Sequence, residues 1–200
     1  DEATAMEQLA EEFRAPALDE KGAFANLARE LGYLPLALSL AAAHLRDGFT
    51  PDEFLALLRA DRFDVDHPDA ARGDDDRRRR NVRKTFSLSL DLLRRSLGVR
   101  GEELLGGFYA FGHAPAAGVG ASLGAGLTGL SAVDFKRLAM TATRLSVLDR
   151  SASEPPRWRM HPLLAELVRA RADGGAVLAR MTEWFVARLP EESATDARAQ

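Results

Sequence analysis

The stretch "RWRMHPLLAELVR" (157–169) changes its pattern at one residue and decides how the surrounding chain folds. Up to Met160 the polar and apolar side chains alternate, as they do in a half-buried strand. From Pro162 onward the apolar residues recur at helical spacing, and proline favours the first position of a helix. His161 lies at the junction of the two patterns. The stretch therefore predicts a strand that runs directly into a helix, with a histidine held between them.

The segments on either side of this stretch extend the pattern. "SVLDR" (146–150) also alternates, and the turn-forming "SASEPP" separates it from "RWRM", so we expect a hairpin. A helix is predicted over 131–145, where Ser131 and Asp134 form a capping pair. Another helix is predicted over 162–172. A helix, a hairpin and a helix in this order suggest a winged-helix domain, with the hairpin as the wing.

The first part of the chain predicts a small bundle of four helices. The third is apolar nearly all round ("PLALSLAAAHL"), which is typical of a buried helix. The fourth opens with a capping box from Thr50 to Glu53, and Gly32 is placed to end the second. The four are expected over 3–14, 19–31, about 35–46, and from Thr50 to about 62. The polar residues 63–80 that follow predict a linker or surface loop.

The expected fold class is therefore mainly α: a small helical bundle followed by a winged-helix domain with a β-hairpin wing, plus a C-terminal helix predicted over 175–189. A chain of 200 residues, of which 46% are hydrophobic, suits one domain or two small ones. The predicted boundaries are 1–65 for the bundle, 66–80 for the polar linker, 81–173 for the winged helix and 174–200 for the C-terminal helix and tail.

Composition excludes several kinds of site. The chain has no cysteine, which rules out disulfides and thiolate metal sites. His44, His67 and His113 show no metal-ligand spacing, so we expect no metal. The formal net charge of −3 gives no overall attraction to nucleic acid. Residues 104–133 contain no charged residue and are long enough to span a membrane, but they are rich in glycine, so a buried, tightly turning segment is the better interpretation.

Four stretches occur in an order that resembles a known family. They are "GYLPLAL" (32–38), "VRKTFSLSLDLL" (82–93), "FKRLAMTATRLSVLDR" (135–150) and "RMHPLLAELVR" (159–169). The first resembles the Gly-Leu-Pro-Leu motif, and the last the Met-His-Asp motif, of the NB-ARC class of signal-transduction ATPases (STAND proteins). No Gly-x-x-x-x-Gly-Lys-Ser/Thr loop occurs in the sequence. The resemblance implies the helical (ARC1) and winged-helix (ARC2) subdomains, starting just after the P-loop domain.

The resemblance also implies roles for two residues. Pro35 would pack on the adenine ring, and His161 would contact the terminal phosphate in the closed, ADP-bound state. Without the resemblance, Pro35 simply opens a helix and His161 is a structural histidine. The chain departs from the family pattern in two places: Tyr33 replaces the usual leucine or glycine, and Pro162 replaces the aspartate after the histidine.

The family implies a regulatory, autoinhibitory role in a bacterial switch ATPase. This chain alone is then not an enzyme and has no catalytic residue, and ADP or ATP binds only together with the P-loop domain. Its expected partners are that domain, C-terminal sensor repeats and further copies of itself after activation. A cytoplasmic location is expected, without a membrane contact. If Pro35 and His161 serve one nucleotide, they should face a common open side.

Two alternatives come from other classes. A winged helix in a transcription regulator would bind DNA through Lys136, Arg137 and Arg144 and through the wing residues Arg150, Arg157 and Arg159. This basic set is modest, so direct DNA binding is not favoured.

A serine hydrolase would use Ser122 within Gly120-Ala-Ser-Leu-Gly124, then Asp134 or Asp149, then His161. The poor strand before Ser122 argues against that enzyme. Arg77–Arg80 follow three aspartates and are expected to be solvated.

Overall fold

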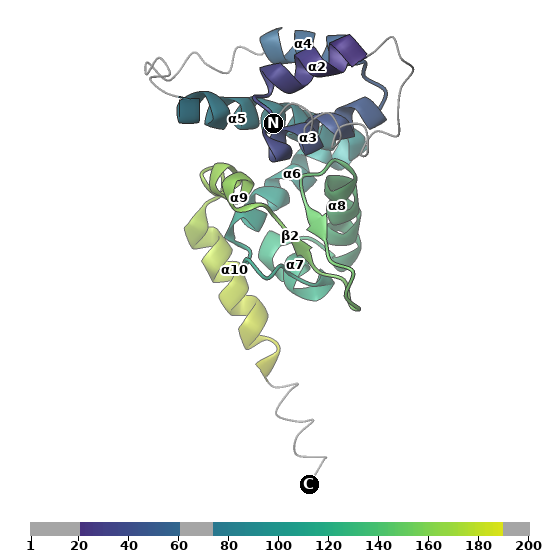
Figure 1. Ribbon diagram of the computed structural model, residues 1–200. Helices are drawn as coiled ribbons and strands as arrows, with labels where there is room; N and C mark the ends of the chain where they lie inside the picture. The colour runs from purple at the N-terminus through teal and green to yellow at the C-terminus, as the bar shows by residue number, and fades with distance from the viewer. Residues whose placement is uncertain (1–20, 61–73, 190–200) are drawn as a thin grey trace. The chain divides into compact units, whose positions relative to one another are not determined.

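The computed structural model describes residues 21–60 and 74–189, which are mainly helical and include one antiparallel sheet of two strands (Figure 1). The mainly α fold class is thus confirmed. Packing divides the chain into two compact units. The first unit reaches Leu93 and includes Arg144–Val147, and the second unit comprises the rest from Arg94 onward.

The first unit contains α2 (Lys21–Glu30), α3 (Pro35–Arg46), α4 (Pro51–Ala60) and most of α5 (Asp74–Ser96). Helix α3 is its centre, because Ala37, Leu38 and every residue from Leu40 to Leu45 are buried. Its apolar sequence predicted this burial. The second, third and fourth predicted helices are confirmed, whereas the helix predicted over 3–14 lies outside the described residues.

Helix α4 begins with the predicted capping box. The Thr50 amide donates to Oε2 of Glu53 at 2.8 Å, and the Glu53 amide donates to Oγ1 of Thr50 at 3.2 Å. The same bond from the Thr50 backbone lowers the pKa of the Glu53 carboxyl below its usual value. These reciprocal bonds satisfy amides that the first helical turn leaves without a partner.

Helix α5 corrects the prediction of an irregular segment over 63–80, because the helix already begins at Asp74. Residues 61–73 lie outside the described range, but 74–80 are helical. A sequence that is acidic at the first turn of a helix is compatible with the helix dipole. The two compact units part within α5, between Leu93 and Arg94. The linker predicted over 66–80 as a domain boundary stays a prediction.

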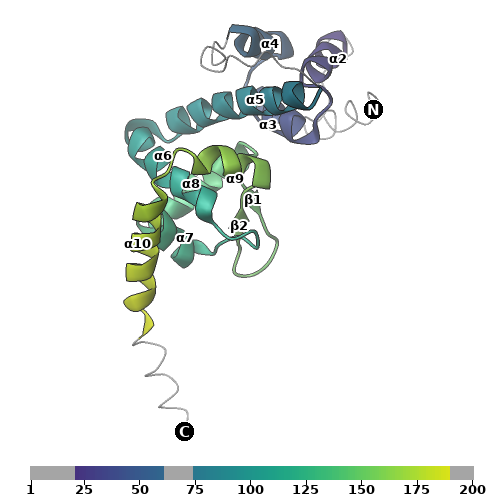
Figure 2. The same cartoon turned by 90° about the vertical axis from the view of Figure 1, so that its left-hand side faces the viewer.

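The second unit contains the remaining elements. They are η2 (Gly98–Arg100), α6 (Gly101–Tyr109), η3 (Ala110–His113), α7 (Ala121–Thr128), α8 (Ala132–Arg144), β1 (Asp149–Arg150), β2 (Trp158–Arg159), α9 (Pro162–Arg169) and α10 (Gly174–Val186). Helix α9 packs on η3, and α10 packs along α7 (Figure 2). The helices predicted over 131–145, 162–172 and 175–189 are all present with shorter bounds.

The uncharged segment 104–133 is buried only in part, because its core-facing apolar residues are buried whereas residues 115–117 and 131–133 are exposed. Leu104, Phe108, Phe111 and Val119 are at most 1% exposed. Helix α7 within it was not predicted, because glycines interrupt its apolar pattern. Within the described residues no helix is long and apolar enough to cross a bilayer.

An aromatic row forms the core of the second unit. The ring centroids of Phe108 and Phe111 lie 6.3 Å apart, and those of Phe111 and Phe135 lie 6.2 Å apart. Trp158 ends the row, with its ring 5.6 Å from Phe135 and nearly perpendicular to it. All four side chains are almost completely buried. The row therefore ties α6, η3, α8 and β2 into one core.

The predicted hairpin is present but short. Asp149 pairs with Arg159, and Arg150 pairs with Trp158. On its other edge, Trp158 exchanges two backbone hydrogen bonds with Val119, at 2.8 and 2.9 Å. Gly118 makes this approach feasible, because a Cβ there would lie 2.7 Å from the Trp158 carbonyl oxygen. The strand β2 is thus held on both sides.

An ionic network joins η2 to the start of α8, and it should make the stability of the second unit depend on pH in acid. The Arg100 guanidinium bonds Glu103 at 2.7 Å and Asp134 at 2.8 Å. The hydrogen bond from Arg100 lowers the pKa of Glu103. The pKa of Asp134 is lowered mainly by the hydrogen bond from the Ser131 hydroxyl, and further by the bond from Arg100. A carboxyl whose pKa is lower in the folded than in the unfolded state stabilises the folded state. This contribution is fully present at pH values above the unfolded pKa. That contribution is lost as the pH falls through the folded value.

We therefore expect the urea midpoint of the second unit to fall as the pH drops below the ordinary carboxyl values of 4.5 and 3.8. Arg100→Met should flatten this dependence, whereas Arg150→Met leaves the network intact and should retain it. An identical acid slope in the wild type and Arg100→Met would contradict the prediction.

Candidate functional site

The two residues singled out by the family resemblance lie in different compact units. Pro35 belongs to the first unit and His161 to the second. The expectation that they face one common side therefore stays a prediction. Each residue has a defined local geometry. Pro35 can offer an apolar contact to a ligand, whereas His161 can offer a hydrogen bond.

Pro35 is presented by a tight turn between α2 and α3. The Tyr33 amide donates to the Ala28 carbonyl and the Gly32 amide to the Arg29 carbonyl, both at 3.0 Å. This pair of bonds is a Schellman motif, with Gly32 in the left-handed conformation at φ 66°. Tyr33 is also left-handed, at φ 55°, which is rare for a bulky residue. The turn confirms that Gly32 ends the helix.

Pro35 itself is the first residue of α3 and is exposed. Its ring fixes φ at a helical value, and a proline at this position gives up no intrahelical hydrogen bond. The strained turn before it sets where the ring lies. The arrangement is suited to an apolar contact with a flat ligand surface, and it serves equally well as a helix start.

His161 caps α9 through its side chain. Its backbone is extended, with φ −58° and ψ 136°, and Nδ1 accepts a hydrogen bond from the Leu163 amide at 3.2 Å. A nitrogen that accepts this bond carries no proton, so the neutral ring holds its proton on Nε2. Pro162 is the first helical residue and has no amide to satisfy. The first turn of α9 is thus capped by the histidine itself.

A close approach of two backbones positions α9. A Cβ on Gly112 would lie 2.7 Å from the Arg169 amide nitrogen and 3.0 Å from the Ala165 carbonyl oxygen, so only glycine fits at this contact. The Arg169 guanidinium donates two bonds to the Gly112 carbonyl, at 3.0 and 2.9 Å. Since η3 and α9 touch through main chain at Ala165 and Arg169, helix α9 is held against η3 in the second unit.

His161 lines a cavity of about 620 Å³. The wall consists of η3 and the residues after it, both strands, and the first turns of α9. Two cationic side chains, Arg159 and Arg169, line the cavity together with two acidic ones, Asp149 and Glu166. Arg159 lies 3.4 Å from Asp149, and Arg169 is bonded to Gly112. The charges balance, so the cavity is no ready-made phosphate cradle. Its clearest contribution to an anion is a single donor, Nε2–H of His161.

The hydrolase alternative finds no support in the geometry around Ser122. Ser122 is the second residue of α7, and its hydroxyl lies 3.4 Å from the Arg188 guanidinium. Before it, Val119 forms only an isolated bridge, where a nucleophile elbow requires a strand of a sheet. Both candidate acids are also occupied, since Asp134 bonds Arg100 and Asp149 pairs with Arg159.

Packing accounts for Gly124 and Gly126, the two glycines that follow Ser122 in α7. A Cβ on Gly124 would overlap the Phe135 ring, and a Cβ on Gly126 would overlap the Trp184 ring. Small residues are therefore required here to let α8 and α10 approach α7.

The basic residues proposed for DNA binding are partly engaged within the second unit. Arg137 donates to the Leu97 carbonyl at 3.0 Å, Arg157 donates to the Gly118 carbonyl at 2.8 Å, and Arg159 faces Asp149. Lys136 and Arg144 on α8 and Arg150 on β1 are exposed. Exposed apolar side chains share that face of α8, with Val133 79% and Met140 57% exposed. This surface is a weak electrostatic footprint for nucleic acid.

The other histidines differ from each other in their surroundings. His44 is buried in the first unit, where Nε2 bonds the Ser89 hydroxyl at 3.1 Å. His67 lies outside the described residues. His113 lines a second pocket, which sequence reasoning missed because nothing near it in sequence marks it. Among the residues that the structure describes, no group of three or more histidines and acids could hold a metal ion.

Comparison with known proteins adds no assignment: no family model matches the chain, and no curated protein sequence matches it.

Proposed function

We propose that this chain is the regulatory, nucleotide-sensing part of a STAND/NB-ARC switch ATPase. In this proposal it closes over ADP that is bound by a P-loop domain of the same protein. The observation that carries the proposal is the cap at His161. Nδ1 accepts the hydrogen bond from the Leu163 amide, so Nε2–H is left as a donor. This donor belongs to an exposed side chain beside a large cavity. One such donor suits one phosphate oxygen of a ligand held mainly by another domain.

The finer fold supports the same proposal. Helix α8, the hairpin and α9 follow one another as in a winged helix, and the bridge from Val119 to Trp158 adds a third extended segment at the hairpin. We propose that this part of the chain is a winged helix and that α2 to α4 form the helical subdomain before it. The P-loop domain, sensor repeats and additional copies of the chain are its proposed partners, in a cytoplasmic protein. In the same proposal Pro35 contacts the adenine.

The proposed switch follows from differential binding. A ligand shifts a conformational balance only if it binds one arrangement better than the other. A hydrogen bond to a charged group is worth about 1.5–3 kcal/mol, so loss of the His161 contact should shift the balance by about ten- to a hundredfold. The chain itself would supply this contact and no catalytic group.

The test is the rate of ADP dissociation from the complete protein, with two substitutions at one position. His161→Ala removes both the cap and the donor, whereas His161→Asn replaces the ring with a short side chain that still caps helices well. We expect both variants to release ADP about ten- to a hundredfold faster and to oligomerise more readily. Thermal unfolding should show that Asn retains more of the stability of α9 than Ala does.

This pair of variants separates the two interpretations of His161. If Asn releases ADP at the wild-type rate while Ala alone is destabilised, His161 is only a helix cap and the proposal is wrong. A complete protein that binds no nucleotide would also overturn the proposal.

A further inference from the structure

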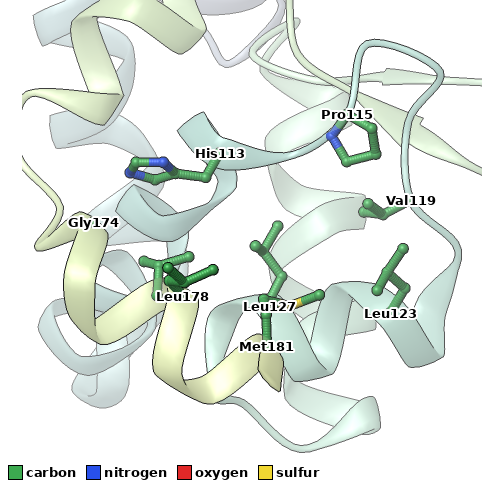
Figure 3. Close-up of a pocket in the computed structure, with 9 residues that line it drawn as sticks. His113, Pro115, Val119, Leu123, Leu127, Gly174, Leu178 and Met181 are labelled. Carbon is green, nitrogen blue, oxygen red and sulfur yellow. The ribbon is translucent and has the colours of Figure 1, made fainter. Parts of the chain in front are cut away.

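A second pocket of the second unit lies apart from the proposed nucleotide contact. It has a volume of about 180 Å³ and is enclosed by η3 with the residues after it, α7 and α10 (Figure 3). Most of its wall is apolar and is made by Val119, Leu123, Leu127, Val177, Leu178 and Met181. An apolar cavity of about 150 Å³ is large enough to hold a benzene ring.

One polar group distinguishes this pocket from an ordinary packing defect. His113 lines it, and its Nε2 is buried without a hydrogen-bond partner among the described residues. Figure 3 shows the His113 ring beside Gly174, at the start of α10. Buried side-chain nitrogens in folded proteins nearly always have a partner, so an orphaned one next to an open pocket points to a ligand group.

Helix α10 begins close to that nitrogen. A methyl group on Gly174 would lie 3.4 Å from Cε1 and 3.9 Å from Nε2 of His113, which is ordinary contact distance. No aspartate, glutamate, lysine or arginine lines the pocket. A charged ligand would therefore lose its hydration without gaining an ionic partner.

We infer that this pocket binds a small neutral aromatic molecule with one hydrogen-bonding group, of the phenol class. The ring would fill the apolar part between α7 and α10, and the hydroxyl would bond Nε2 of His113. A hydroxyl can either donate to a neutral imidazole nitrogen or accept from it. The inference uses only the second unit and does not depend on the proposed nucleotide switch.

Methyl-resolved NMR titration of the full chain tests the inference with phenol, benzene and benzoate. We expect saturable shifts at the methyl groups of Leu127, Val177 and Met181, and none at Val133 on α8. Phenol should bind about 2- to 10-fold tighter than benzene, the ratio that one net hydrogen bond contributes, and benzoate should bind more weakly than phenol.

Two variants locate the polar contact. His113→Phe keeps a ring and removes the nitrogen, so it should bind phenol and benzene equally. Gly174→Ala places a methyl beside Nε2 and should reduce phenol affinity more than benzene affinity. The inference is overturned if the pocket methyls show no saturable shift, if the wild type binds phenol and benzene equally, or if His113→Phe keeps the preference for phenol.

Discussion

Trp158→Ala should destabilise the second unit by about 3–5 kcal/mol, the usual cost of removing a large buried aromatic side chain. Trp158 is 1% exposed and ends the aromatic row against Phe135. Its backbone also pairs with β1 on one side and with Val119 on the other. A cavity at this position would loosen the hairpin and the segment that leads to His161. Urea unfolding followed by far-UV circular dichroism measures the effect.

Trp158→Phe is the matched control. It keeps a ring against Phe135 and removes Nε1, a buried donor without a partner among the described residues. Removing an unsatisfied polar group offsets part of the lost packing, so we expect the Phe variant to cost less than about 1.5 kcal/mol. If Trp158→Ala unfolded at the wild-type midpoint, the aromatic row would not be the core of this unit.

Gly124→Ala and Gly106→Ala should differ by about 3 kcal/mol in unfolding free energy, although both replace a helical glycine by alanine. Alanine favours a helix over glycine by about 1 kcal/mol at either position. At Gly106 a Cβ meets nothing within 4 Å, so this variant should be more stable than the wild type. At Gly124 the Cβ would overlap the fully buried Phe135 ring, and an overpacked core costs up to about 3 kcal/mol.

The same experiment tests whether Gly120-Ala-Ser-Leu-Gly124 is a packing motif. Ser122→Ala changes an exposed hydroxyl and should alter stability by less than about 0.5 kcal/mol. If Gly124 is glycine because Phe135 packs against it, Gly124→Ala should lower the stability of the second unit and Ser122→Ala should leave it unchanged. Equal stability of the Gly124 and Gly106 variants, or esterase activity that Ser122→Ala abolishes, would reverse that conclusion.

Local signals predicted much of this fold because their physical causes lie within a few residues. The capping box from Thr50 to Glu53 and the Schellman glycine at Gly32 each satisfy backbone groups of an adjacent helix turn. The alternation around Trp158 followed by Pro162 likewise predicted the change from strand to helix, and His161 does lie at that junction.

Other features could not be predicted because their causes are distant in sequence. Helix α7 consists of small residues with no helical stripe, and its glycines are explained by Phe135 and Trp184, which come later in the chain. Helix α5 begins in a highly charged stretch, whose composition is also typical of a loop. Composition and periodicity contain no information about a side chain that packs against a segment from another element.

For the candidate sites, the sequence by itself identified His161 as a residue between two regular elements and Pro35 as a helix start. Only the tertiary structure decided that Nδ1 of His161 caps α9, that Gly112 brings η3 against that helix, and that His113 is left beside an apolar pocket. The reason is physical. A helix terminus is determined by the residues that flank it, whereas the hydrogen-bond partners and free volume around a side chain are determined by whichever segments the fold brings there.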